Sequence, residues 1–232
     1  KMPDHTKVYK NQTELYDQMV SKQPSLLKVI EELTPINQLD VIDMGAGSGR
    51  LTDILAPQVK SILALDSSAE MLKIVDEKLK DNTGLSYKTQ VADHRKIPAA
   101  NDSADLVVAG WTICYLGSSN VENNVHNIET VMKEIMRVLR TKGTVIIFET
   151  MGTGFETPNP PEFLKHYYSL LENEYGFSHK WIRTDYQFDS LQQADELTRF
   201  FFGDELAERV VKENLITLPE CAGVWWLKKD TN

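Results

Sequence analysis

Cysteine is scarce in this chain of 232 residues, and the two that occur, Cys114 and Cys221, show no CxxC spacing. This scarcity argues against a disulfide framework and favours a reducing, cytoplasmic setting. The five histidines are scattered without paired spacing, so no metal site is expected. No apolar run approaches the roughly 18 residues that a membrane span requires, so neither a secretory leader nor a membrane partner is expected.

Positive charge is also in deficit, since 25 Lys and Arg stand against 34 Asp and Glu, a net charge of −9. A nucleic-acid polymer calls for a basic face, so this balance argues against nucleic acid as a partner. The length suits a single domain, as a monomer or a homodimer. We expect an N-terminal helical segment over 1–36, a ligand-binding core over 37–150, and substrate-side additions with a closing strand pair over 151–232.

Short apolar strands alternate with amphipathic helices through the first two thirds of the chain. A helix is predicted from Leu26 to Leu33, a second after the capping box Ser67–Glu70, and a third from Ile128 that ends near Gly143. Near-continuous apolar strands separated by helices predict a parallel sheet that is covered on both faces, which is a doubly wound α/β fold. The predicted strands are 39–44, 61–66, 85–93, 104–110 and 144–149.

The regular alternation of strands and helices ends after Glu149. A proline-rich loop leads into a predicted helix over 161–174, with Pro161 in its first turn. Two further strands are predicted over 179–188 and 216–229, with a helical segment between them.

The sequence VIDMGAGSGRLT (Val41–Thr52) places three glycines between a strand and a helix. Such a loop lets a ligand approach the backbone closely, and the helix N-terminus favours negative charge. A triphosphate is disfavoured because no Gly-Lys-Ser/Thr ends the loop, and a dinucleotide is disfavoured because the spacing is GxGxG rather than GxGxxG. Asp43 precedes the loop, and Asp66 ends the next strand, where a carboxylate can accept hydrogen bonds from ribose hydroxyls.

These features together resemble the class I S-adenosylmethionine (SAM)-dependent methyltransferases. Their acidic residue followed by GxGxG is matched by Asp43–Gly49, and their ribose-binding acid by Asp66. Later motifs are matched by VADHRKIP, ADLVVAGWTICYL and IMRVLRTKGTVIIFE, although Thr141-Lys142 stands where Pro-Gly is usual before Gly143. The resemblance implies SAM as cofactor and a seven-stranded, mostly parallel sheet in the order 3-2-1-4-5-7-6.

The resemblance also implies a set of cofactor contacts. The loop amides would hold the methionine part of SAM, Asp66 the ribose, Met71 with Ile97 the adenine ring, and Asp93 its amino group. Asp43 would either orient the loop or meet the ammonium group through water, Met71 has a plain core role as its alternative, and His94 is either an edge contact to adenine or a solvated residue. The full set is Asp43, Gly45, Ala46, Gly47, Gly49, Arg50, Asp66, Ser67, Met71, Ala92, Asp93, His94, Gly110 and Trp111.

The methyl acceptor is expected to be the O, N or C atom of a small molecule. Transfer from a sulfonium is an in-line displacement, so a base is needed only where the acceptor must lose a proton. The candidate catalytic residues are Glu149, His94 and Tyr115, with His126 and His166 as further possible bases. The aromatic residues expected near the acceptor are Trp111, Tyr115, the Phe155 loop, Tyr167, Tyr168, Trp181 and Tyr186. Most of them are expected in the core rather than in the pocket, and Trp111 and Tyr115 are the preferred wall residues.

One tempting motif is set aside. Asn159-Pro160-Pro161-Glu162 is similar to the motif of amino-methylating nucleic-acid enzymes, but it follows the fifth strand and lacks the aromatic residue. The alternatives that stay open are a tRNA or protein methyltransferase and a non-catalytic SAM-binding module, with a nicotinamide dehydrogenase last. Residues 151–168 and 200–203 are expected to form a mobile cover over the acceptor, or else to pack as fixed structure.

Overall fold

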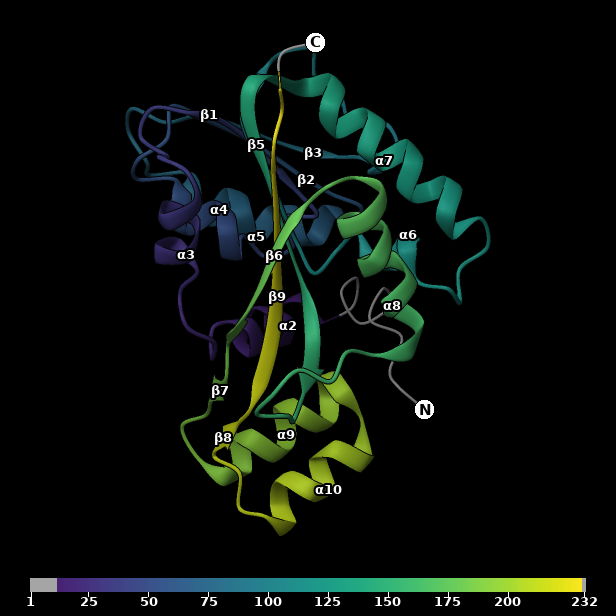
Figure 1. Cartoon of the computed structure of the whole chain (residues 1–232). Helices are drawn as coiled ribbons and strands as arrows, with labels where there is room; N and C mark the ends of the chain where they lie inside the picture. Colours follow the sequence, from purple (N-terminus) through teal and green to yellow (C-terminus); the bar gives the residue numbers. More distant parts are fainter. Residues whose placement is uncertain (1–11, 231–232) are drawn as a thin grey trace.

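The computed structural model describes residues 12–230, and its centre is one twisted sheet with helices on both sides (Figure 1). Within that range the strands of this sheet follow the order β3-β2-β1-β4-β5-β9-β6. The first five are parallel, and β9 runs antiparallel between β5 and β6. The predicted fold class and strand order are confirmed. The strands are β1 Asp40–Met44, β2 Ser61–Asp66, β3 Ser86–Val91, β4 Ala104–Gly110, β5 Leu139–Thr153, β6 Ser178–Arg183 and β9 Glu220–Lys228.

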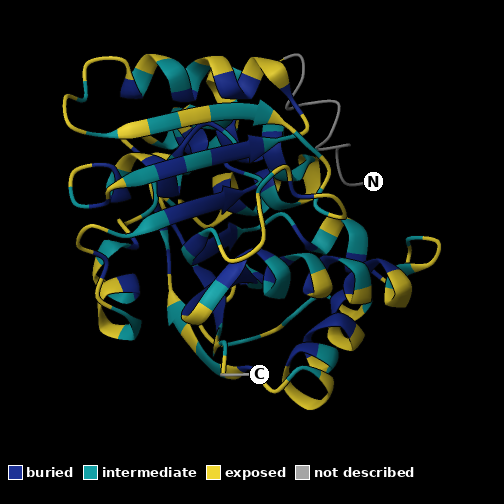
Figure 2. Cartoon of the chain, turned by 90° about the horizontal axis from the view of Figure 1, so that it is seen from above, coloured by how far each residue is buried: buried dark blue, intermediate teal, exposed yellow. Residues whose placement is uncertain are grey.

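The helices divide between the two faces of the sheet. Apolar residues of α3, α4 and α5 join one buried cluster, and those of α7 and α8 join the other. Figure 2 shows the buried residues along the central strands and the exposed ones on the outer sides of the helices. The helices are α2 Thr13–Val20, α3 Leu27–Leu33, α4 Arg50–Leu55, α5 Ala69–Leu79, α6 Cys114–Gly117, α7 Asn124–Val138, α8 Glu162–Ser169, α9 Leu191–Phe202 and α10 Asp204–Lys212, with a π-helix at Leu170–Glu174.

Alternation along each central strand feeds both clusters. In β4, Val107 and Ala109 belong to the cluster under α7, whereas Leu106 and Val108 belong to the cluster under α4 and α5. Because side chains of a strand point alternately to its two faces, a strand buried on both sides must be apolar throughout. This explains the uninterrupted sequence Leu106–Ala109.

A third, smaller hydrophobic cluster lies beyond the sheet. It joins Met19 of α2 to Tyr186 of β7 (Tyr186–Gln187), Leu218 of β8 (Thr217–Leu218), and residues of α9 and α10. The strands β7 and β8 pair only with each other. The predicted single strands 179–188 and 216–229 are therefore wrong, since each is split in two. Pro219 separates β8 from β9 because it has no N–H for a ladder.

Several predicted boundaries also move. The third helix ends at Val138 rather than near Gly143, because Lys229 Nζ donates to the carbonyls of Met136 and Leu139 at 2.7 and 2.8 Å and satisfies that helix end. Ser68 rather than Ser67 caps α5, accepting from Met71 N at 3.3 Å.

The helix over 161–174 is likewise less regular than predicted. Pro161 is the residue before α8 and does not lie in its first turn, and the last turn of the predicted helix is the π-helix. Strand β3 covers Ser86–Val91, a shorter range than the predicted 85–93.

The centre of the sheet places the site. β1 pairs with β2 on one side and with β4 on the other, so the connections that follow β1 and β4 leave in opposite directions. Ligands of open α/β sheets bind in the crevice outside the carboxyl ends of the strands at such a point. None of the helices in the described range has the length and apolar character needed to cross a membrane.

Candidate functional site

Two adjoining hollows lie at the carboxyl ends of β1, β2 and β4. The larger has a volume of about 740 Å³ and the smaller about 160 Å³. They share Tyr16, Gly45, Gly110, Trp111 and Tyr115 in their walls, so the two hollows lie side by side. A ligand with two chemically different parts can therefore extend from one into the other.

Asp66 ties the glycine loop to the second strand in the smaller hollow. Its Oδ2 accepts from Gly47 N and its Oδ1 from Ser68 N, both at 2.9 Å. Burial raises the pKa of Asp66, and these backbone donors act in the opposite direction. The carboxylate lines the hollow together with Ser67 and therefore remains reachable for a ligand.

The far wall of the smaller hollow consists of Ala92, Asp93 and His94. The Asp93 carboxylate binds the Arg95 side chain through both oxygens, and these hydrogen bonds lower the pKa of Asp93 to about 2. His94 Nε2 lies 2.7 Å from Thr112 Oγ1, and burial lowers the pKa of His94 to about 4. His94 is thus neutral at physiological pH and tied to the loop after β4.

The loop Gly45–Gly49 needs its glycines for two reasons. Gly45, Gly47 and Gly49 all have positive φ, a region that favours glycine. A Cβ on Gly45 would also lie 2.1 Å from Thr112 Oγ1, so any side chain there would displace the loop after β4. The glycine at 45 is therefore needed for close packing against the loop after β4, whereas the Cβ position of Gly47 faces Tyr16, which lines both hollows.

Asp43 and Arg50 stand at the end of the larger cavity next to this loop. Asp43 Oδ2 accepts from Thr52 Oγ1 at 2.6 Å, whereas its Oδ1 has no hydrogen-bond partner within residues 12–230. Burial raises the pKa of Asp43 to about 7. Arg50 donates from Nη1 to Gln23 Oε1 at 2.8 Å and lies 4.2 Å above the Trp111 ring, but its Nη2 is likewise unpartnered in the described range.

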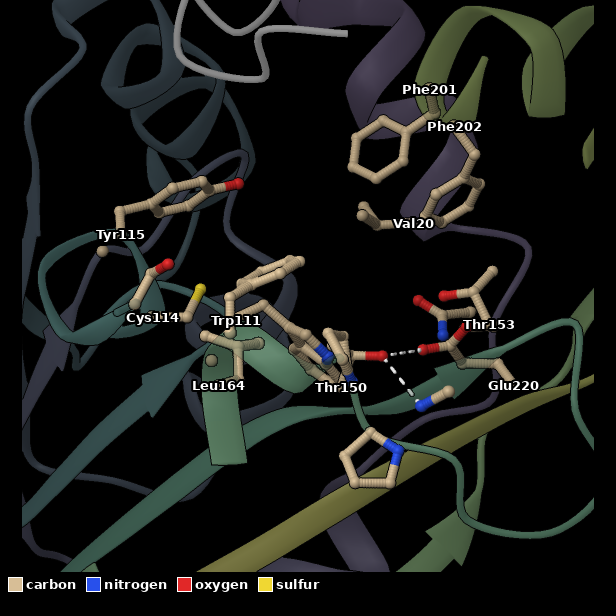
Figure 3. A pocket seen from close by; sticks show the side chains of 18 of the residues that line it. Val20, Trp111, Cys114, Tyr115, Thr150, Thr153, Leu164, Phe201, Phe202 and Glu220 are labelled. Carbon is tan, nitrogen blue, oxygen red and sulfur yellow. Dashed lines mark hydrogen bonds between the residues drawn. The ribbon is translucent and has the colours of Figure 1, made fainter. Parts of the chain in front are cut away.

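The rest of the larger cavity is mainly apolar. Figure 3 shows Trp111, Tyr115 and Leu164 across from Val20, Phe201 and Phe202, with Glu220 beside Thr150 and Thr153 at the end of the view. Trp111 has a positive φ of 51°. Its backbone N–H donates to Phe148 O at 2.8 Å, which holds this residue at the strand end.

Comparison with known proteins agrees with this geometry. Residues 42–147 match the family model described as a methyltransferase domain. The chain is also similar in fold to the YcgJ protein of Bacillus subtilis, with a TM-score of 0.60, 15% identity, and coverage of 89% of this chain and 98% of that one. Residues 42–147 are thus similar to a methyltransferase domain, and the fold is shared with a solved SAM-dependent methyltransferase of Aquifex aeolicus at a TM-score of 0.57 and 16% identity, covering 92% of this chain and 96% of that one.

Two further relatives define how far this likeness extends. The demethylmenaquinone methyltransferase of Thermotoga maritima is 28% identical over 146 residues, which cover 62% of this chain and 55% of that protein. The chain thus spans about half the length of this curated relative. The [4+2]-cyclase SpnF shares the fold with a TM-score of 0.62 at 14% identity, covering 97% of this chain and 96% of that one. The fold alone therefore does not fix the reaction.

The structure gathers nearly all predicted cofactor residues around the two hollows. Asp43, Ala46 and Arg50 line the larger one and Gly47, Asp66, Ser67, Ala92, Asp93 and His94 the smaller, while Gly45, Gly110 and Trp111 line both. Gly49 and Met71 line neither. Gly49 is the residue before α4, and Met71 is a fully buried residue of α5, which agrees with its core alternative. Ile97 is also a buried core residue that lines neither hollow.

The predicted catalytic residues are dispersed. Tyr115 lines both hollows, and His94 lines only the smaller one. Glu149 is fully buried and lines neither, since its Oε2 accepts from the Tyr167 hydroxyl at 2.6 Å and from Cys114 N at 3.0 Å. His126 and His166 are exposed and lie outside both walls.

The aromatic residues expected near the acceptor divide between the cavity wall, the core and the sheet edge. Trp111, Tyr115, Phe155 and Tyr186 line the larger cavity. Tyr167 and Tyr168 belong to the core instead, and Trp181 is 44% exposed on the sheet edge.

The sequence did not predict that Glu220 and helix α2 help to line the larger cavity. Tyr16, Val20 and Gln23 of the N-terminal region all line the larger cavity. The spacing of Leu15 and Met19 was the available signal for this short helix.

Proposed function

We propose that this chain binds SAM across the two hollows and transfers its methyl group to a small molecule. The observation that carries the proposal is the pair formed by Asp43 Oδ1 and Arg50 Nη2. One is a buried acceptor and the other a buried donor, both are unpartnered in the described part of the chain, and both residues line the larger cavity. An amino acid with a free ammonium and a free carboxylate group fits such a pair.

The neighbouring hollow fits the rest of the cofactor. Asp66 is positioned for two hydroxyl groups of a ribose, and Asp93 and His94 form the wall beyond it. The glycine loop Gly45–Gly49 adjoins both hollows, since Gly45 lines both of them. It therefore lies between the residues proposed for the nucleoside and those proposed for the amino-acid part of SAM. Bound here, SAM supplies a methyl group on a positively charged sulfur. Arg50 and Asp43 would orient the amino-acid part, and Asp66 the nucleoside.

The aromatic walls would serve the transfer step. Displacement at a methyl group depends mainly on alignment of the two reacting atoms and on exclusion of water. Trp111, Tyr115 and Phe202 would shield the reacting region, which joins the two hollows. The bound acceptor would occupy the apolar remainder of the larger cavity.

A small acceptor is favoured over a macromolecular one. The cavity is a hollow in the range typical of small-molecule sites, and the net charge of −9 does not suit an RNA surface. Relatives that are named for methylation of demethylmenaquinone and phosphoethanolamine agree with a metabolite as acceptor.

The test is calorimetry with SAM and with its demethylated product, S-adenosylhomocysteine. We expect Asp66→Ala to raise the SAM Kd at least tenfold, because a carboxylate hydrogen bond contributes roughly 1.5–3 kcal/mol. Asp53→Ala is the matched control, since Asp53 is an exposed carboxylate of α4 that lines neither hollow. An unchanged Kd for a folded Asp66→Ala protein removes the carboxylate from the site.

Transfer is then followed with methyl-labelled SAM against a mixture of metabolites. Release of labelled product supports an enzyme with a small acceptor. Tight SAM binding without any turnover supports a non-catalytic SAM-binding module, and labelling of only tRNA or protein supports a macromolecular acceptor.

A further inference from the structure

The charged residues that line the larger cavity differ in whether they have a partner or a proposed role. Asp43 and Arg50 belong to the end assigned to the cofactor. Glu162 and Lys165 lie on α8, pair with each other at 2.8 Å, and are 84% and 52% exposed at the rim. Among the charged lining residues in the described range, Glu220 remains, deep in the wall and without a charged partner in contact.

Glu220 is held firmly, but one of its oxygens is not used. The residue begins β9 opposite Thr153, where β5 has a bulge between Thr150 and Thr153. Thr150 Oγ1 donates to Glu220 Oε1 at 3.0 Å, whereas Oε2 has no partner within residues 12–230. Only 2% of the residue is exposed, so Oε2 is a buried acceptor in the wall of an apolar cavity (Figure 3). A buried acceptor without a donor is unfavourable unless a ligand supplies one.

The backbone of Glu220 is also fixed on both sides. Its N–H donates to Asp185 Oδ1 at 3.0 Å, and its carbonyl accepts from Thr184 N at 2.9 Å. These bonds leave the side chain little freedom to move away from the cavity. The position therefore has the rigidity expected of a residue that meets a ligand.

The walls near Glu220 define what that ligand is like. They are formed by aromatic and aliphatic side chains from four parts of the chain, which suits an apolar body with at least one ring. The lining residues of this kind are Val20, Trp111, Phe155, Phe163, Leu164, Phe201, Phe202 and Leu206.

We propose that the acceptor is a neutral, apolar, ring-bearing molecule with a hydroxyl group, and that Glu220 Oε2 takes the proton of that hydroxyl. This inference rests on the proposed function. The acceptor oxygen forms a bond to the methyl carbon, the bond between that carbon and the donor sulfur breaks with its electron pair left on sulfur, and the hydroxyl proton passes to the Glu220 carboxylate. A hydroxyl needs such a base to become a good nucleophile, whereas a neutral amine can attack with its own electron pair.

The electrostatic surroundings suit this task. Burial raises the pKa of Glu220 to about 7, which the neighbouring hydroxyl groups of Thr153 and Thr150 and the charge of Arg50 oppose. A base with a pKa near the working pH is the most effective proton acceptor. The titratable and charged groups that face Glu220 from the elements around it are Arg50, Tyr168, Asp185, Tyr186 and Cys221.

The test uses two probes of similar shape, 2-naphthol and naphthalene, on protein saturated with S-adenosylhomocysteine. We expect the wild type to bind 2-naphthol roughly tenfold more tightly than naphthalene, because a hydrogen bond to a carboxylate is worth about one order of magnitude in affinity. This preference should grow as the pH rises from about 6 to about 8 and the carboxylate ionises. Glu220→Leu should abolish the preference while S-adenosylhomocysteine binds as in the wild type.

Two further variants complete the design. Glu220→Gln keeps the shape but cannot ionise, so it should show a small preference with no pH dependence. Glu162→Gln changes an exposed carboxylate at the rim of the same cavity and should leave the preference and its pH dependence unchanged. Thermal unfolding of each variant reports whether the protein is folded.

The outcomes separate the two proposals. If S-adenosylhomocysteine does not bind the wild type, the proposed function fails and this inference fails with it. If it binds normally but the wild type binds neither probe, or if the preference persists in Glu220→Leu, only the inference about Glu220 and its acceptor is overturned.

Discussion

Gly47 occupies a position where a side chain would be strained and obstructed at the same time. Its φ is +57°, and a Cβ on it would lie 3.3 Å from the Tyr16 ring, which is shared by both hollows. The first effect concerns stability alone, whereas the second concerns the space that a cofactor needs. A second glycine separates these effects, because Gly84 has a φ of +85° with no atom of the described residues within 4 Å of its Cβ position.

We predict that Gly47→Val weakens SAM binding more than Asp66→Ala does. It should also lower the free energy of unfolding by about 1–3 kcal/mol, the usual cost of a side chain in a strained backbone region. Gly84→Val should lose a comparable amount of stability but keep the wild-type Kd. Calorimetry and urea denaturation measure the two quantities. Normal SAM affinity in a folded Gly47→Val protein would rule out the assignment of the loop.

Residues of the cofactor end were predictable because they are local. Asp43, Gly45, Gly47 and Arg50 lie within one strand–loop–helix, so their spacing in the sequence is also their arrangement in space. Glu220 was not predictable, because it meets the cavity only when β9 inserts between β5 and β6. A glutamate before an apolar strand carries no signal by itself.

The segments after β5 and at the end of α9 lie beside the larger cavity. Thr153, Phe155 and Leu164 line it from the first segment, and Phe201 and Phe202 line it from the second. Their position fits the predicted cover, although their mobility stays a prediction. Both lie outside β1, β2 and β4, at whose carboxyl ends the two hollows are found.

We predict that both segments gain protection from hydrogen exchange when S-adenosylhomocysteine is bound together with an acceptor-sized probe such as 2-naphthol. The reason is that a filled cavity gives Phe155, Phe201 and Phe202 packing partners. Exchange followed by mass spectrometry measures this, and β4 within the central sheet should not change. If the Gly45–Gly49 loop gains protection but neither segment does, these segments are fixed structure and the acceptor enters elsewhere.

The strands and helices of the first two thirds of the chain follow their hydrophobic period closely. The predictions that were wrong concern the ends of helices and strands, where contacts with residues far away in the sequence decide the boundary. Lys229 ends α7 early, and the pairing of β9 with β5 lengthens β5 well beyond the apolar run that predicted it. Local patterns do not contain these contacts, because the partners lie some ninety residues apart in the chain.

Within residues 12–230, burial raises the pKa of three carboxyl groups to about 7 or 8. Burial raises the pKa of Asp43 to about 7, that of Glu149 to about 8 and that of Glu220 to about 7. Of these, Glu149 lines neither hollow and is bonded to Tyr167 and Cys114. It is therefore the group through which stability can be examined separately from ligand binding.

We predict that the free energy of unfolding falls as the pH rises from about 5 to about 8. In this window the unfolded chain has released the proton of each carboxyl, whose ordinary pKa is about 4, while the folded chain still retains it. These carboxyl groups contribute their full stabilisation below the ordinary pKa of about 4. That contribution is lost as the pH rises through their raised pKa in the folded chain. Urea denaturation at several pH values measures the loss, which is on the order of 2–4 kcal/mol for Glu149 alone.

Glu149→Gln should remove much of that pH dependence, since an amide cannot ionise. Glu129→Gln should retain the wild-type dependence, because Glu129 is exposed on α7 and pairs only with Lys133 among its described neighbours. Equal slopes for Glu149→Gln and wild type would mean that the buried carboxyl does not control stability in this range.

The third hydrophobic cluster is separate from the two clusters that pack on the central sheet. α2, β7, β8, α9 and α10 share a small core of their own, and Phe201 is both a member of that core and a wall of the cavity. The members of this small core within 186–218 belong to neither cluster of the central sheet, whereas Tyr16 of α2 reaches the loop at Gly47. Acceptor choice can therefore diversify by natural variation or by engineering within 186–218, while the cofactor half is inherited unchanged.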